Sequence, residues 1–336
     1  MKQFRLTNWM GALIPLILIC GNSLFTNPRV KADRQTITLP AFAELPSQKI
    51  IHPEDWLEEQ LSMPPSSLLN QLEAAAITPT DERAIEQFWR DAYRQAPDQL
   101  RQRLALALSR IFQLSFAPDG LTSVYAQAQL FDIFLDRAFG NYEDLLYTVS
   151  LHPIAGHQGA YLNNPLSVPE WGWQPNNRFA CQLLSGLTLG QPVEHFSEQE
   201  IKGLGQVFTG LGAGELTEFG YLEGYENPEF GVPYFAIDPL VPMQFYADFH
   251  ESSAKLLPGG FRLPAGQSGE MDLQQALRHL VQQPQTAQHL SRTLLRELWQ
   301  MEPTEDKVTA VAAVFRDNGN GVCGDLAAVV RAILIG

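Results

Sequence analysis

The sequence predicts a mainly α protein, a multi-helix orthogonal bundle with long irregular loops and room for a small β-hairpin. Apolar residues recur at the three-and-four spacing of amphipathic helices through most of the chain. Two stretches rich in Gly, Pro and aromatic residues, 151–175 and about 213–270, break this rhythm. The helix pairs have unequal lengths and no fixed-period repeat, which argues against a solenoid.

The first residues have the pattern of a cleavable signal peptide. Lys2 and Arg5 give a basic start, and the apolar run 10–20 is shorter than the ~20 residues that a membrane-spanning helix needs. Residues 30–32 form a small-x-small cleavage pattern, so we expect cleavage after Ala32. The expected mature protein is exported, periplasmic or extracellular, and has no transmembrane segment.

The charge of the chain bears on its partners. The formal net charge is −14, and removal of the leader, which holds basic residues and no acidic one, makes it more negative. A strongly acidic surface repels phosphate backbones, so nucleic acid is not expected as a partner. The sequence names no cofactor, and the expected partner is an unknown protein or small molecule.

The chain divides into three parts. Residues 1–32 are the signal peptide, 33–97 an N-terminal extension with short helices, and 98–336 a helical domain. Three helices are expected in the extension. The first covers 54–61, the second follows a cap at Ser66, and the third begins at the start signal Thr78-Pro79-Thr80-Asp81. The domain continues with helices over 100–112, one closing at Gly140 and one capped by Asn141.

The stretch 176–212 is expected to form two helices joined by a turn. In the first, apolar residues from Phe179 to Leu187 have helical spacing, and Gly190 supplies a left-handed cap. Ser197 and Glu200 have the spacing of a capping box at the start of the second. The irregular segment 151–175 leads directly into this pair, and long irregular segments inside a domain are often functional.

Polar side chains at the entry to the first helix, and others in the preceding segment, are the ligand-binding candidates. They are Asn176, Asn177, Arg178, Gln182, His152 and Trp171. The alternative is that the residues on the helix only cap it.

The later part of the chain contains one strand candidate and further helices. Residues 243–250 alternate apolar and polar side chains, which favours a strand. Helices resume at Asp272, and the last is expected to run from Asp325 through Ile333.

The catalytic candidates are His250, Glu251 and Lys255, the densest ionisable group in the irregular half. A histidine beside an acid could act as a base and its orienter, or bind a metal together with His152 or His157. The alternative is a solvent-facing strand end in which Lys255 pairs with Glu251. The sequence has no G-x-S-x-G, H-E-x-x-H, P-loop or C-x-x-C motif, and we assign no metal ligands.

Two other patterns have both a functional and a structural interpretation. Tyr161, Trp171 and Trp173 could stack on a sugar or a peptide, or cover a core. Residues 317–321, DNGNG, resemble a calcium loop, but glycines occupy positions where side-chain oxygens are needed, which favours a helix cap and turn.

Several motifs, in order, resemble the bacterial domain-of-unknown-function family 1800. The motifs are LALALSRIFQLS, RAFGNYEDLLYTVSLHP, PNNRFACQLLSGLTLG, SEQEIKGLGQVFTG, FHESSAKLLPGG and VAAVFRDNGNGVCGDLAAVVRAIL. The resemblance covers roughly Leu100 to the C-terminus and implies a large, mostly helical, exported protein of uncharacterised biochemistry.

The departures from this family concern two arginines. Where the family usually has P-N-E-N-Y-A-R-E, this chain has Cys181 and Gln182 in place of Arg-Glu, and Cys323 replaces the arginine of G-V-R-G-D-L. If the Arg-Glu pair is catalytic in the family, this member has lost the activity. The paired replacements suggest the hypothesis of a disulfide between Cys181 and Cys323.

The function expected first is binding of a ligand or partner at a face made by the Asn176 helix, the segment 151–173 and the His250 segment. The alternative is a hydrolase-like enzyme, with or without a metal, centred on His250 and Glu251. A third possibility is a structural envelope protein, which an exposed apolar patch without a pocket would favour.

Overall fold

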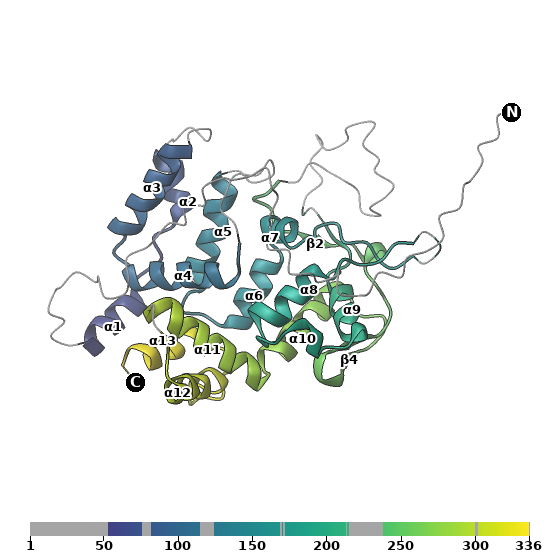
Figure 1. The fold of residues 1–336 in the computed structure, drawn as a ribbon. Helices are drawn as coiled ribbons and strands as arrows, with labels where there is room; N and C mark the ends of the chain where they lie inside the picture. Colours follow the sequence, from purple (N-terminus) through teal and green to yellow (C-terminus); the bar gives the residue numbers. More distant parts are fainter. Residues whose placement is uncertain are drawn as a thin grey trace, which may run out of the picture.

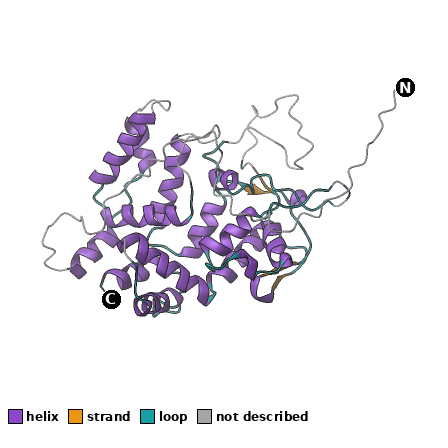
Figure 2. Cartoon of the chain, in the orientation of Figure 1, coloured by secondary structure: helices purple, strands orange, loops and turns teal. Residues whose placement is uncertain are grey.

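The computed structural model describes residues 53–75, 82–114, 124–168, 170, 172–212, 214, 238–299 and 302–335. These residues form thirteen α-helices and two small antiparallel sheets of two strands each (Figure 2). The prediction of a mainly α fold is therefore confirmed. Within the described ranges, no helix has the length and apolar character to cross a bilayer.

The N-terminal helices pack against the body of the protein. They are α1 (Pro53–Ser62), α2 (Leu68–Ala75) and α3 (Glu82–Gln95), followed by α4 (Gln99–Ile111) and α5 (Val124–Arg137). The expected cap of α2 at Ser66 is off by one residue, because the Ser67 hydroxyl accepts the Asn70 amide at 3.0 Å. Asp132 of α5 also accepts the Leu68 and Leu69 amides, at 2.7 and 3.1 Å. The expected start signal of α3, 78–81, lies outside the described residues.

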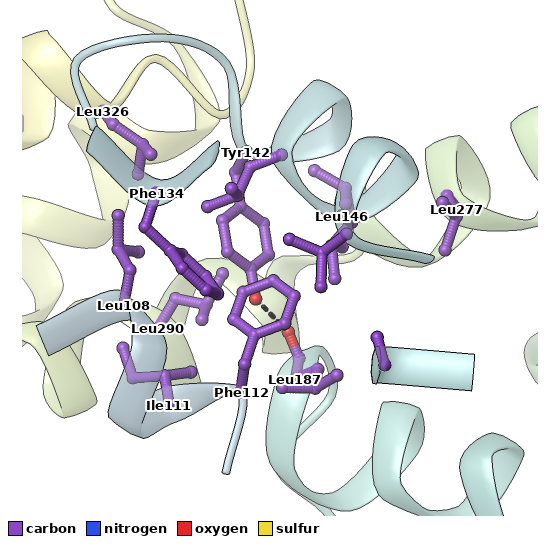
Figure 3. Packing of buried hydrophobic residues seen from close by; sticks show 14 of the residues in the cluster. Leu108, Ile111, Phe112, Phe134, Tyr142, Leu146, Leu187, Leu277, Leu290 and Leu326 are labelled. Atoms are coloured by element: carbon purple, nitrogen blue, oxygen red, sulfur yellow. Dashed lines mark hydrogen bonds between the residues drawn. The ribbon is translucent and has the colours of Figure 1, made fainter. Parts of the chain in front are cut away.

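Helix α6 (Tyr142–Ser150) lies at the centre, and Asn141 caps it as predicted by accepting the Glu143 amide. Tyr142 is fully buried, and its hydroxyl donates to the Leu187 carbonyl at 2.7 Å. Figure 3 shows this bond inside a shell of leucines and phenylalanines that includes Leu108, Phe134 and Leu146. The hydroxyl thus has a partner in the middle of the core, as a buried phenol requires.

The central helix pair departs from regular geometry. Helix α8 (Arg178–Gln182) continues into a π-helical turn, η4 (Leu183–Leu187), and the Thr188 amide and hydroxyl both donate to the Leu183 carbonyl at 2.8 and 2.6 Å. Gly190 has the expected left-handed conformation, with φ of 64°. After the short turn η5 (Val193–His195), α9 (Glu198–Val207) begins at the predicted capping box of Ser197 and Glu200.

The irregular parts contain short elements. Residues 153–158, expected to be irregular, form α7 (Pro153–Gln158). Strand β1 (Leu211–Gly212) pairs with β2 (Gln244–Phe245), and β3 (Lys255–Leu257) pairs with β4 (Phe261–Leu263) through the turn η8 (Pro258–Gly260). The predicted small hairpin is therefore present.

The predicted strand over 243–250 is wrong except at Gln244 and Phe245. The chain after Tyr246 turns into the 3₁₀ element η7 (Ala247–Phe249), because the Phe249 amide bonds to the Tyr246 carbonyl at 3.0 Å. The apolar alternation is real, but local turn bonds interrupt it.

The C-terminal helices are α10 (Gly269–Val281), α11 (Pro284–Trp299), α12 (Glu305–Arg316) and α13 (Leu326–Leu334), drawn in green to yellow in Figure 1. The segment before α13 returns to α6. The Tyr142 amide bonds to Gly324 O at 2.8 Å, and the Leu326 amide to Gly140 O at 2.9 Å. The start of α6 and the start of α13 are thereby joined.

Candidate functional site

Three segments that are distant in sequence meet around Asn164, which is 2% exposed. Its side-chain oxygen accepts the Asn176 amide at 2.7 Å, and its own carbonyl accepts the Gly210 amide at 3.0 Å. The side-chain amide is directed to the Gly205 carbonyl at 3.5 Å. We call this meeting point of 163–168, 176–178 and 205–210 the polar junction.

The His250 segment is attached to the same place. The Asn163 amide donates to the Leu211 carbonyl at 2.8 Å, and β1 is paired with β2 just before His250. Glu251 reaches back across the junction, since its Oε2 accepts the Ser167 amide at 3.3 Å. The structure therefore brings together the three segments that the sequence analysis combined into one face.

Next to the polar junction lies a hydrogen-bonded group of polar and ionisable side chains, which we call the charge clasp: Thr209, His250, Lys255 and Asp272, which are buried, and Gln267, which is partly buried. The Asp272 carboxylate, 0% exposed, accepts Lys255 Nζ at 2.6 Å and His250 Nε2 at 3.0 Å on one oxygen. Its other oxygen accepts Gln267 Nε2 at 2.7 Å. The clasp ties together the end of α9, the strand β3 and the first turn of α10.

The contacts of His250 occupy both of its ring nitrogens. Nδ1 lies 2.8 Å from the Thr209 carbonyl, which can only accept. The Thr209 hydroxyl, 3.3 Å from the same nitrogen, gives its proton to Gln206 O and accepts the Glu251 amide. Nε2 faces the Asp272 carboxylate in turn, so neither ring nitrogen of His250 is free.

Lys255 is equally occupied. Besides Asp272, its Nζ donates to the Glu251 carbonyl at 2.5 Å and the Ser253 carbonyl at 3.2 Å. These three acceptors match the three protons of an ammonium group. The predicted local pairing of Lys255 with the Glu251 side chain is absent, and the contact is to the Glu251 backbone.

The two carboxylates of this region are held in their charged forms. Desolvation by itself raises the pKa of Asp272, but hydrogen bonds from His250, Lys255 and Gln267 outweigh it and lower the pKa below its usual value. The pKa of Glu251 is also lowered, because hydrogen bonds from Ser253 and Ser167 outweigh the effect of burial. The positive charges of the clasp thus face negative charges.

Three members of the clasp, Thr209, Gln267 and Asp272, were not predicted as site residues. Asp272 lies 22 residues from His250 and in the first turn of a helix, where an acidic residue is common for local electrostatic reasons. The available signal was the pair His250 and Lys255, two basic residues in one irregular segment.

His152 occupies a different environment. It is 3% exposed, and its Nδ1 accepts the Ile154 amide at 3.2 Å, so that it caps α7. Burial lowers the pKa of His152 to about 4, which makes it a neutral ring with its proton on Nε2 at neutral pH. That Nε2 is buried and has no hydrogen-bond partner among the residues that the structure describes.

The candidates on α8 separate into two groups. Asn176 is exposed, with its Oδ1 accepting the Arg178 amide at 2.8 Å, while the buried Oδ1 of Asn177 has no partner and faces Gly205 of α9. Arg178 is exposed beside them. Gln182 instead donates to the Phe112 carbonyl at 3.0 Å, at the end of α4. It belongs to the contact between α8 and α4.

Of the aromatic candidates, Tyr161 is buried and Trp173 is half-buried. Tyr161 is 0% exposed and packs on Phe179 and Phe208, with ring centroids 4.3 and 5.2 Å apart. It is therefore a core residue, and the stacking interpretation is wrong for it. Trp171 lies outside the described residues.

The predicted disulfide between Cys181 and Cys323 is wrong. Cys323 is a free thiol, and its Sγ is directed to the Val281 carbonyl at the end of α10, at 3.9 Å. Cys181 is on α8 instead. Burial raises the pKa of the Cys323 thiol, which keeps it in the unreactive protonated form.

The loop 317–321 uses its oxygens internally. Asp317 Oδ1 accepts the amides of Gly319 and Gly321 at 2.8 and 2.9 Å, which is the cap-and-turn interpretation. Among the residues that the structure describes, no group of three or more His, Cys, Asp or Glu side chains is arranged to hold a metal ion.

The family model described as "Protein of unknown function (DUF1800)" matches residues 37–335, and the chain belongs to this family. The match begins well before Leu100, so the expectation that the similarity starts there is corrected. No curated protein and no solved structure matches the chain.

Proposed function

We propose that the protein is a binding protein whose ligand or partner docks at the polar junction. The supporting observation is that two buried polar atoms of the junction, Asn163 Oδ1 and Asn177 Oδ1, have no hydrogen-bond partner among the described residues, and that Ser150 Oγ and His152 Nε2, in the segment leading to the junction, have none either. Each such atom costs about 1–3 kcal/mol, and in native proteins most find a partner in protein or ordered water. A ligand that supplied these bonds would recover part of that energy.

The unpartnered atoms favour a neutral ligand with both donors and acceptors. The oxygens of Asn163 and Asn177 accept, the Nε2–H of His152 donates, and the Ser150 hydroxyl does either. None of these groups is charged at neutral pH. An amide-bearing chain such as a peptide, or a hydroxyl-rich molecule such as a saccharide, has this pattern.

The test is photo-crosslinking in cells that produce the full chain. A photoreactive amino acid replaces Asn176, which is exposed at the junction, and in a matched control it replaces Asp306, which is exposed on α12. We expect an adduct of defined mass from position 176 alone. Equal adducts from both positions, or none from either, would contradict binding at the junction.

The hydrolase alternative has less support from the geometry. A general base needs a free nitrogen within reach of a substrate, whereas both nitrogens of His250 contact Thr209 and Asp272 inside the protein. Glu251 is separately engaged with Ser167 and Ser253. Catalysis by this pair would require His250 to give up a bond of the charge clasp.

We also propose that the protein is exported and acts outside the cytoplasm. The support is the basic start, the short apolar run and the small-x-small pattern ending at Ala32. N-terminal sequencing of protein recovered from the periplasm or the medium should begin at Asp33. Recovery of an intact Met1 only from the cytoplasm would contradict export.

A further inference from the structure

The loop between α12 and α13 contains two Asn-Gly pairs, Asn318-Gly319 and Asn320-Gly321. In such a pair, the backbone nitrogen of the glycine can attack the side-chain amide carbon of the asparagine. Glycine favours this reaction because it has no side chain to hinder the approach and adopts many backbone conformations. Two identical dipeptides in one loop allow the effect of structure on this chemistry to be isolated.

The surroundings of the two attacking nitrogens are closely matched. Gly319 N and Gly321 N both donate to the same oxygen, Asp317 Oδ1, at 2.8 and 2.9 Å. Both glycines have positive φ, 90° and 77°, and both lie in open space, with no atom within 4 Å of where a Cβ would be. The nucleophiles therefore give no reason for the two pairs to react at different rates.

The two side-chain amides differ. Asn318 is clamped at both ends: its Nδ2 donates to Asp325 Oδ2 at 2.6 Å, and its Oδ1 accepts the amides of Asn320 and Val322 at 2.9 and 3.3 Å. Asn320 is exposed, and its side chain has no hydrogen bond to any residue that the structure describes. Asn320 can rotate toward Gly321 N at no cost in bonds, whereas Asn318 would have to break three.

We propose that Asn320 is a site of spontaneous deamidation in the folded protein and that Asn318 is protected from it. Gly321 N gives up its hydrogen bond to Asp317 Oδ1, forms a bond to Cγ of Asn320 and loses its proton to solvent; the bond from Cγ to Nδ2 breaks, Nδ2 takes up a proton, and ammonia leaves. Water then opens the cyclic imide to aspartate or isoaspartate. The net reaction consumes one water, releases ammonia and involves no oxidant or reductant.

The product changes the loop in two ways. A new carboxylate appears between Asp317 and Asp325, and the isoaspartate form adds a methylene group to the main chain. Asp325 caps α13 by accepting the Ala328 amide at 3.1 Å, and its other oxygen holds Asn318. Modification of Asn320 therefore places negative charge beside the segment that connects α13 to α6.

The experiment is a time course of the purified full chain at neutral pH and physiological temperature, folded and in denaturing urea. Fragment spectra of the tryptic peptide 317–331 assign conversion to each asparagine. In the folded protein, we expect aspartate and isoaspartate to accumulate at Asn320 while Asn318 remains an amide. In urea, both should convert at similar rates. Equal conversion of the two in the folded protein would overturn the proposal, as would an inert Asn320.

A variant tests whether the clamp is the cause of protection. Asp325→Ser keeps a side chain that can cap α13 but removes the acceptor of Asn318 Nδ2. With folding verified by circular dichroism, conversion at Asn318 should rise severalfold toward that at Asn320. Unchanged protection of Asn318 in a folded Asp325→Ser protein would show that the bond to Asp325 does not protect it.

Discussion

At the scale of single residues, Asp272 has the largest effect that the structure predicts. It is the shared acceptor of two buried side chains, the His250 ring and the Lys255 ammonium, which are 4% and 1% exposed. A buried ion network is costly to assemble, and the penalty for removing one member exceeds the net stability that the network contributes. The charge clasp therefore specifies how the end of α9, β3 and α10 come together.

We predict that Asp272→Ala lowers the free energy of unfolding by about 3–5 kcal/mol, because it leaves the buried Lys255 ammonium without its carboxylate and the buried His250 ring without one of its acceptors. The matched control is Glu270→Ala, an exposed acid in the same helical turn, for which a change within about 0.5 kcal/mol is expected. Urea denaturation measures both. Similar losses in the two variants would contradict the role assigned to Asp272.

His152 should make the protein sensitive to mild acid. Its pKa is lowered to about 4 in the folded protein, against about 6.5 in an unfolded chain. Because the pKa is lower in the folded protein, the stabilisation that comes from burying a neutral His152 ring is complete above pH ~6.5 and is lost as the pH falls toward 4. The free energy of unfolding should decrease over this range by at most about 3 kcal/mol.

The variant His152→Asn isolates this effect, because Asn can still accept the Ile154 amide as an N-cap but does not titrate. We expect the unfolding free energy of the wild type to fall more steeply than that of the variant between about pH 6.5 and 4. Parallel curves over this range would show that His152 does not titrate as inferred.

At the scale of elements, α9 packs against its neighbours at two glycines, where no side chain separates the helix backbone from them. A methyl group at Gly203 would overlap the Leu256 carbonyl of β3, and one at Gly205 would overlap the side chain of Asn177. The sequence Gly203-Leu204-Gly205 has the first two glycines of a dinucleotide-binding loop, G-x-G-x-x-G, but not the third. Close packing explains both of its glycines. The two glycines set the distance from α9 to the β3 strand and to the polar junction.

Gly203→Ala should destabilise the protein by about 1–3 kcal/mol through overpacking, although alanine is the better helix former by about 1 kcal/mol. Lys202→Ala, at the exposed neighbouring position, should be neutral or slightly stabilising. Thermal or urea unfolding distinguishes the two. A stabilised Gly203→Ala protein would mean that β3 can move away at little cost.

The elements that the sequence predicted well are those specified locally. The caps at Asn141 and Ser197 and the stop at Gly190 were all correct, because each depends on neighbours within a few residues. The helix α7 and the turn after Tyr246 have local bonds, but their signals are short and lie inside irregular segments. Strand β2 depends on distant partners, through its pairing with β1 and the neighbouring bond from Met243 N to Leu151 O. For the same reason, His250 and Lys255 could be selected from the sequence but not joined to Asp272.

At the scale of the whole molecule, the N-terminal helices are integrated with the rest. The buried guanidinium of Arg101 donates to the Met63 carbonyl at 2.9 Å, and the buried carboxylate of Asp98 accepts the Ser66 amide at 2.9 Å. Arg331 of α13 forms an ion pair with Glu58 of α1. Helices from both ends of the described chain therefore meet (Figure 1).

A chain that begins at residue 98 should consequently be unstable. It lacks the partners of Asp98 and Arg101, and each unsatisfied buried group costs about 1–3 kcal/mol or more. The control is the chain that begins at Asp33, which we expect to unfold in a single cooperative transition. Circular dichroism with urea compares them. A stable, cooperatively folded chain from residue 98 would show that the earlier helices are dispensable.

The π-helical turn η4 has a consequence for the phase of the polar residues on α8. A π turn contains one more residue than an α turn, and each residue advances a helix by about 100°. The side chains before η4 therefore point in a direction about 100° away from the one they would have if the helix were regular throughout. Deleting one residue from Leu183–Leu187 would let the later leucines keep their places in the core while Asn177 turned away from Gly205. Relatives with and without this extra residue would present different sides of the same helix to a ligand.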